Sequence, residues 1–60
     1  MTKEQMAVIQ IKSMINSIVE EGPEDVAAWE WRAHLQDVLR DLESGRLSVE
    51  EASDELGVRL

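Results

Sequence analysis

Four side chains that could bind a metal ion or transfer a proton recur along one segment of the chain. In order they are Glu30, His34, Asp37 and Asp41. Separations of four, three and four residues place these groups along one side of a helix. In helical bundles such groups hold metal ions together with ligands from facing helices. A first helix predicted over residues 3–19 offers only Glu4 and, at its end, Glu20 for this purpose, although a dimer would double the set. We therefore predict a solvated polar face and no metal site.

The sequence also lacks the residue set of a nucleophilic or acid–base enzyme. His34 is the only histidine, and so the only ordinary general base near neutral pH. The serines fall at expected helix caps or on a polar helix face, and there is no glycine-rich phosphate-binding loop. A chain of 60 residues has little mass with which to enclose a ligand pocket. We predict that the protein is not an enzyme and needs no cofactor.

The chain is short and acidic, and both properties restrict its function. Residues 1–60 make a single domain at most, and a domain of this size buries only about 60% of its unfolded surface. There is no cysteine, so disulfides and thiolate zinc sites cannot supplement the core. Oligomerisation or partner binding is the remaining way to stabilise so small a core. We expect a homo-oligomer, most simply a dimer.

The net charge of -7 is unevenly distributed, because residues 20–60 hold all but one of the 13 acidic side chains. Such a surface repels nucleic-acid phosphates and attracts basic surfaces, although it also serves solubility alone. The opening MTKEQMAVIQ has no continuous apolar core like that of a signal peptide. No run approaches the roughly 18 apolar residues of a membrane span. We expect a cytoplasmic protein with no membrane or direct nucleic-acid partner.

The first of three predicted helices covers residues 3–19. Thr2 and Gln5 form the Thr-x-x-Gln pattern of a capping box. Apolar residues then follow the three-and-four spacing of packed helices at Val8, Ile11, Ile15 and Ile18. Ala7, Met14 and Val19 widen this face. Met6 and Ile9 lie instead among polar side chains, on the side of the helix that faces away from the core.

The second predicted helix covers residues 23–44. Gly22 suits the end of the preceding helix and Pro23 suits the first position of this one. Glu24 and Asp25 would then lie in the first turn, near the positive end of the helix dipole. Its main apolar face consists of Ala27, Ala28, Trp31, Leu35, Val38, Leu39 and Leu42. Gly45 is the expected residue after its end.

The third predicted helix, residues 49–56, is short. Ser48 and Glu51 form a second capping box, and Gly57 ends the helix. The fold class is therefore an all-α, small three-helix protein in which residues 3–19 and 23–44 form an antiparallel hairpin, completed by oligomerisation. The residues that we expect in the core or at an oligomer interface are Ile11, Ile15, Ile18, Trp31, Leu35, Leu39 and Leu42.

The two tryptophans cannot both face one core. Trp31 belongs to the main apolar face, whereas Trp29 points elsewhere, with Val26 and Ala33 at helical spacing beside it. Eight residues of the third helix reach about 12 Å, but Trp29 lies about 22 Å from the end of the second helix. We therefore expect Trp29 at a surface shared with another copy or with a foreign protein. The alternative is a partly exposed tryptophan that lies over a helix, or one that is covered by the N-terminus of the first helix.

The segment Leu47-Ser48-Val49-Glu50-Glu51-Ala52, with Leu56-Gly57-Val58 after it, resembles two families. It is similar to the opening of helix-turn-helix domains of the MerR or excisionase type, in which Leu-Gly-Val leads into a recognition helix. Three residues follow Gly57 here and the local charge is negative, so we expect no DNA reading. The pattern Gly-x-x-Ser-x-Glu-Glu-Ala, which begins at Gly45, also resembles short bacterial helical hairpins of the SHOCT type, in which it joins two helices; this resemblance implies oligomerisation. Neither resemblance assigns a family.

These observations favour a non-enzymatic protein–protein interaction module. It is similar in size and charge to small acidic regulators, inhibitors or adaptors of bacteria and phages. The expected partner-binding residues are Trp29, Val26, Ile9, Glu30, Asp37, Asp41, Glu50 and Glu51. The apolar members would anchor a partner, and the acidic members would steer a basic one toward the surface. The alternatives are a DNA-mimic inhibitor of a nucleic-acid-binding protein and a structural homo-oligomerisation module.

Overall fold

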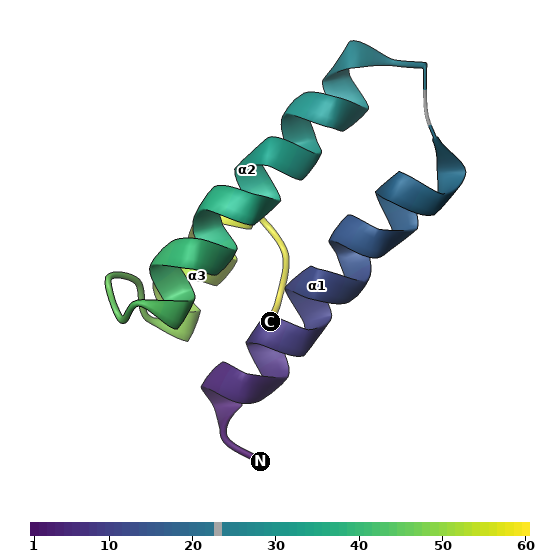
Figure 1. The fold of residues 1–60 in the computed structure, drawn as a ribbon. Coiled ribbons are helices and arrows are strands. Elements are labelled where there is room, and N and C mark those ends of the chain that lie inside the picture. Colours follow the sequence, from purple (N-terminus) through teal and green to yellow (C-terminus); the bar gives the residue numbers. More distant parts are fainter. Residues whose placement is uncertain (23) are drawn as a thin grey trace.

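A computed structural model of the chain describes residues 1–22 and 24–60. It contains three helices in this part of the chain and no strands: α1 (Lys3–Glu21), α2 (Val26–Glu43) and α3 (Val49–Leu56). Helices α1 and α2 form the predicted antiparallel hairpin, and α3 folds back beside the second half of α2 (Figure 1). The tail after α3 ends beside α1, where the Gln10 side chain donates to the Arg59 carbonyl oxygen at 3.3 Å. The all-α class and the hairpin are therefore confirmed.

Helix α1 begins and ends with local signals that the sequence contains. The backbone N–H of Thr2 donates to the Gln5 side chain at 3.0 Å, and the Gln5 N–H donates to the Thr2 hydroxyl at 3.1 Å. This reciprocal pair satisfies donors that the first turn of a helix leaves free. Gly22 adopts the left-handed conformation after the last turn and donates to Ile18 and Val19. The helix runs to Glu21, two residues beyond the predicted end.

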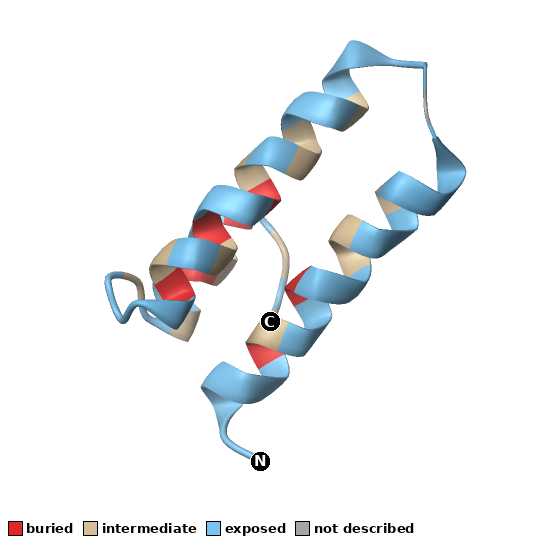
Figure 2. Cartoon of the chain, viewed as in Figure 1, coloured by how far each residue is buried: buried red, intermediate tan, exposed pale blue. Residues whose placement is uncertain are grey.

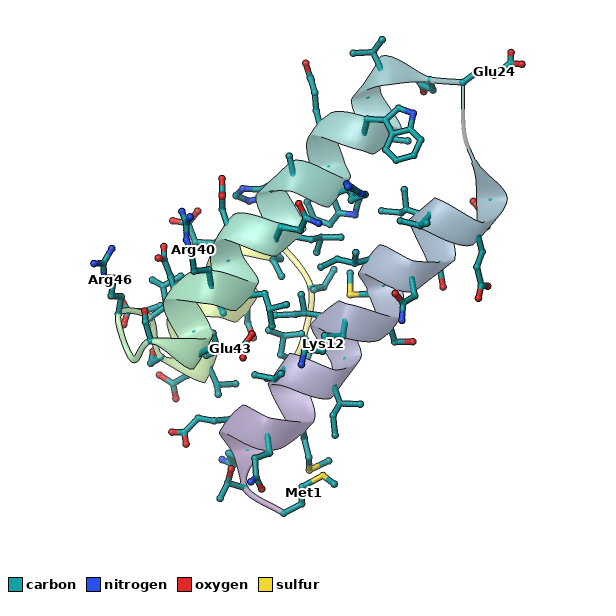
Figure 3. All side chains as sticks on the ribbon, in the orientation of Figure 1. Met1, Lys12, Glu24, Arg40, Glu43 and Arg46 are labelled. Atoms are coloured by element: carbon teal, nitrogen blue, oxygen red, sulfur yellow. The ribbon has the colours of Figure 1, made fainter. Side chains whose placement is uncertain are left out.

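Helix α2 begins later than predicted. Asp25 is extended rather than helical, and its side chain accepts a hydrogen bond from the Ala27 N–H at 3.0 Å. Asp25 is therefore the N-cap, and the prediction that Glu24 and Asp25 occupy the first turn was wrong. A short carboxylate can accept a hydrogen bond from an unpaired backbone N–H of the first helical turn. This is why the helix begins directly after Asp25. Glu24 extends away from the hairpin (Figure 3). The predicted place of Pro23 lies outside the described residues.

A tight turn reverses the chain between α2 and α3. The N–H of Arg46 donates to the Asp41 carbonyl at 2.8 Å, and the N–H of Gly45 donates to the Leu42 carbonyl at 3.3 Å. This pair of bonds defines a Schellman cap, with Gly45 at a φ of 83° in the left-handed region. Ser44 is the C-cap, so α2 ends one residue before the predicted position. The Ser48–Glu51 capping box then starts α3 immediately.

The buried core lies in the half of the hairpin that α3 covers (Figure 2). Its members are Ala7, Ile11, Leu35, Val38, Leu42, Ala52 and Leu56. Of the predicted core set, Ile11, Leu35 and Leu42 are buried. Four others are partly buried and pack against the core, namely Ile15, Ile18, Trp31 and Leu39. Val19 and Ala27 were expected on the core face but are exposed, because they lie at the loop end, beyond the reach of α3.

Within the described part of the chain, the helices are too short or too polar to cross a bilayer.

Candidate interaction surface

The four members of the polar strip on α2, Glu30, His34, Asp37 and Asp41, differ in exposure and in the contacts that they make. His34 is half-buried, and its Nε2 atom lies 3.2 Å from the carbonyl oxygen of Glu55 on α3. Asp37 is exposed and pairs with Arg40 at 3.6 Å. Glu30 is exposed, whereas Asp41 is half-buried. Among residues 1–22 and 24–60, no three His, Cys, Asp or Glu side chains gather in a way that could hold a metal ion.

Two apolar residues near the loop between α1 and α2, Val26 and Trp29, form what we call the loop-end patch. Val26 is 68% exposed and Trp29 is 40% exposed. The guanidinium carbon of Arg32 lies 5.3 Å from the centre of the Trp29 ring, which is the geometry of a cation–π contact. The last turn of α3 contacts α2 at His34, which is five residues along α2 from Trp29. The expectation that α3 cannot cover Trp29 is consistent with this geometry.

Ile9 lies apart from the loop-end patch. It is the seventh residue of α1, whereas Trp29 is the fourth residue of the antiparallel α2. At 1.5 Å per residue, the two side chains start roughly 13 Å apart along the hairpin. Ile9 is 53% exposed, and it belongs to a different hollow of the surface. The three apolar residues expected to anchor a partner are therefore divided between two places.

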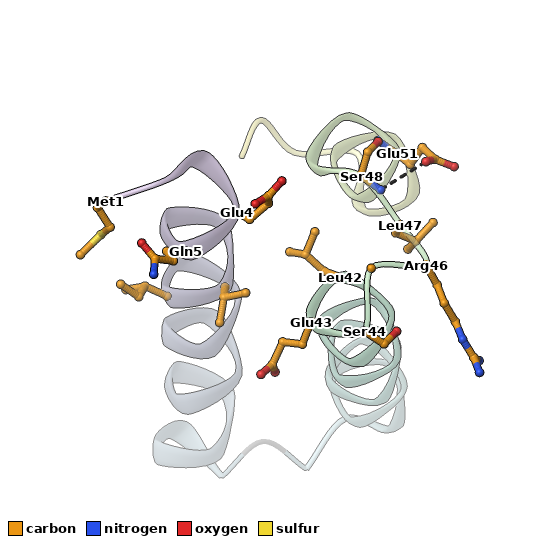
Figure 4. A pocket seen from close by; sticks show the side chains of 13 residues that line it. Met1, Glu4, Gln5, Leu42, Glu43, Ser44, Arg46, Leu47, Ser48 and Glu51 are labelled. Atoms are coloured by element: carbon orange, nitrogen blue, oxygen red, sulfur yellow. Dashed lines mark hydrogen bonds between the residues drawn. The ribbon is translucent and has the colours of Figure 1, made fainter.

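One of the hollows that Ile9 lines lies at the open end of the hairpin, and we call it the open-end groove. It has a volume of about 950 Å³ between the first two turns of α1 and the α2–α3 turn (Figure 4). Its lining residues are Met1, Glu4, Gln5, Val8, Ile9, Leu42, Glu43, Ser44, Gly45, Arg46, Leu47, Ser48 and Glu51. One wall of the groove is therefore a flank of α1, and the other wall is the turn between α2 and α3.

The floor of the open-end groove is apolar and continuous with the core. Leu42 is buried in the core cluster, and Val8 and Leu47 pack against that cluster while they also line the groove. Ile9 adds a more exposed apolar edge. An apolar group bound here would rest directly on the protein's own core, which is the arrangement that gives anchor residues their energy.

The rim of the open-end groove is acidic. Its carboxylates are Glu4 on α1, Glu43 at the end of α2 and Glu51 on α3. Two cations also belong to the lining, the Met1 ammonium and Arg46. The Arg46 side chain extends away from α1, whereas Glu4 points toward the space between the helices (Figure 4). The groove can therefore accept an apolar group that carries positive charges at its edges.

The predicted partner-binding acids have different positions relative to this groove. Glu51 lines it, whereas Glu50 lines a second hollow of about 730 Å³ that also contains Lys3 and Arg59. Sequence reasoning did not select Glu4 or Glu43 as binding residues. They share no helical face, and they come together only because the α2–α3 turn packs near the start of α1.

No family model, curated protein or solved structure matches the chain, so its function has to be inferred from its own residues and geometry.

Proposed function

We propose that this chain is a non-enzymatic protein–protein interaction module, a small acidic regulator, inhibitor or adaptor that acts by occupying the surface of a partner. The observation that carries the proposal is the number of large apolar side chains left in solvent on so small a chain. They are Met1, Met6, Ile9, Val19, Val26 and Trp29, each at least 40% exposed. Exposed apolar side chains that lie together, as Val26 and Trp29 do in the loop-end patch, are typical of surfaces that another molecule covers.

The charge of the chain supports a protein partner with a basic surface. A net charge of -7 on 60 residues attracts cationic surfaces and speeds their association at low salt. It opposes direct binding to nucleic acid, whose affinity depends on cationic contacts to phosphates. The partner would be recognised through apolar contacts and steered by charge.

The proposal is tested by affinity capture from a lysate of the source cells, at low and at high salt, with two baits. One bait is the wild-type chain. The other is the triple variant Ile9→Gln, Val26→Gln and Trp29→Gln, which makes both exposed apolar places polar and leaves the buried core untouched. We expect a stoichiometric partner on the wild-type bait that is weakened at high salt and absent from the variant.

A far-UV circular dichroism spectrum of the variant serves as the folding control. If both baits capture the same proteins, or if neither captures a stoichiometric partner, the proposed function fails. A molar mass above that of the monomer in light scattering, without a foreign partner, would point instead to a homo-oligomerisation module.

A further inference from the structure

We propose that the open-end groove receives a short, basic amphipathic helix of the partner protein. This inference rests on the proposed function and assigns it a place and a ligand chemistry. The groove is preferred to the loop-end patch because it is concave, it is floored by core residues and it carries the acidic rim. The loop-end patch, by contrast, already has the cation of Arg32 over its tryptophan ring.

The shape of the groove suits a helix. On the α1 side the lining residues are Met1, Glu4, Gln5, Val8 and Ile9, which follow the three-and-four spacing of a single helix flank. The α2–α3 turn forms the opposite wall. A helix laid between these walls would contact Leu42 and Val8 with one apolar stripe, as amphipathic helices do in hydrophobic grooves. It would add a fourth helix to the three of the fold.

The charge of the rim selects a basic occupant. Among the described residues, Arg40 forms an ion pair with Asp37. The carboxylates of Glu4 and Glu43 form no ion pair with a cation of this part of the chain. A second copy of this chain would bring its own acidic surface toward these carboxylates, and like charges at an interface are unfavourable. Lysine or arginine side chains that flank an apolar stripe would meet Glu4, Glu43 and Glu51 instead.

The test uses a defined probe, a capped amphipathic peptide of leucine and lysine two heptads long, titrated into the full chain by calorimetry. The matched control probe has glutamate in place of lysine. We expect the leucine–lysine peptide to bind, its affinity to fall as salt is raised, and the leucine–glutamate peptide not to bind. Failure of the leucine–lysine peptide to bind the wild-type chain overturns the inference.

Two pairs of variants locate the binding site. Ile9→Gln should weaken peptide binding about tenfold, because it removes an apolar contact of the groove, whereas Val26→Gln should change it less than about twofold. Glu43→Gln should weaken binding up to about fivefold and Glu30→Gln much less, although each removes one charge from the same helix. All four residues are exposed, so the fold is expected to survive each change. Equal effects within either pair overturn the inference.

The experiments distinguish a failure of the groove inference from a failure of the proposed function. If a captured partner is lost with Val26→Gln and Trp29→Gln but kept with Ile9→Gln, the protein is an interaction module that does not use this groove. If light scattering shows a dimer that Ile9→Gln dissociates, a second copy occupies the groove and the inference is wrong.

Discussion

The Nε2 atom of His34 lies 3.2 Å from the carbonyl oxygen of Glu55, and this contact joins the middle of α2 to the last turn of α3. The carbonyls of a last helical turn have no partner within their own helix, so an outside donor is valuable there. With its proton on Nε2, the imidazole supplies that donor. The ring also lies beside Trp31, with 5.8 Å between the ring centres. A helix of eight residues is marginal alone, and this contact helps to hold α3 in place.

Replacing His34 with alanine should lower the free energy of unfolding by about 1 kcal/mol, which is the usual net value of one such hydrogen bond. Urea denaturation followed by circular dichroism measures it. The matched control is Gln36→Ala on the same helix, at an exposed position, which should change stability by less than about 0.5 kcal/mol. Equal stabilities of the two variants would mean that the His34–Glu55 contact contributes nothing.

The neighbouring residues Ile9 and Ile11 give a direct test of where the core lies. Ile11 is fully buried, whereas Ile9 is more than half exposed. Ile11→Ala should cost about 2–5 kcal/mol, and Ile9→Ala should cost less than about 0.5 kcal/mol because alanine favours the helix and little burial is lost. A domain of this length is stable by only about 3–9 kcal/mol, so Ile11→Ala should leave a large unfolded fraction at 37 °C. A large loss of stability in Ile9→Ala in thermal unfolding would instead show that a second copy covers this position.

The parts of this fold that depend on near neighbours in the sequence could be predicted from it. Both capping boxes, at Thr2 with Gln5 and at Ser48 with Glu51, have the predicted hydrogen bonds. Helix α3 has the predicted bounds for this reason. The three-and-four spacing of apolar residues likewise identified Ile11 as a core residue, because helix periodicity decides which side chains share a face.

The start of α2 could not be predicted in the same way, because two residues compete for it. Pro23 and Asp25 are both typical of helix starts, and only the local backbone decides that Asp25 is the cap. The open-end groove could not be predicted from the sequence for a different reason. Its rim joins Glu4 to Glu43 across 39 positions of sequence, and periodicity within one helix carries no information about such a pairing.

The left-handed conformation of Gly45 sets the direction in which α3 leaves α2. Its φ of 83° disfavours any residue with a β-carbon, although that carbon would meet no atom within 4 Å. Gly45→Ala should therefore cost about 1 kcal/mol from backbone strain alone, partly offset by the stiffer unfolded chain. Gly45→Asn should cost less, since asparagine tolerates this conformation better. The ranking of glycine over asparagine over alanine in urea denaturation checks the assignment, and an alanine variant as stable as the parent would contradict it.

The contact between Arg32 and Trp29 places a cation over one of the two apolar residues of the loop-end patch. The Nε atom of Arg32 is buried without a hydrogen-bond partner among the described residues, and the guanidinium carbon lies 5.3 Å from the centre of the Trp29 ring. A double-mutant cycle with Trp29→Leu and Arg32→Met should give a coupling free energy of about 0.5–1 kcal/mol. Methionine keeps the apolar stem of arginine, so the cycle isolates the cation from the packing of the side chain. Urea denaturation of the four proteins, at low and at high salt, supplies the measurement. A coupling of zero would mean that Arg32 does not hold the Trp29 ring in place.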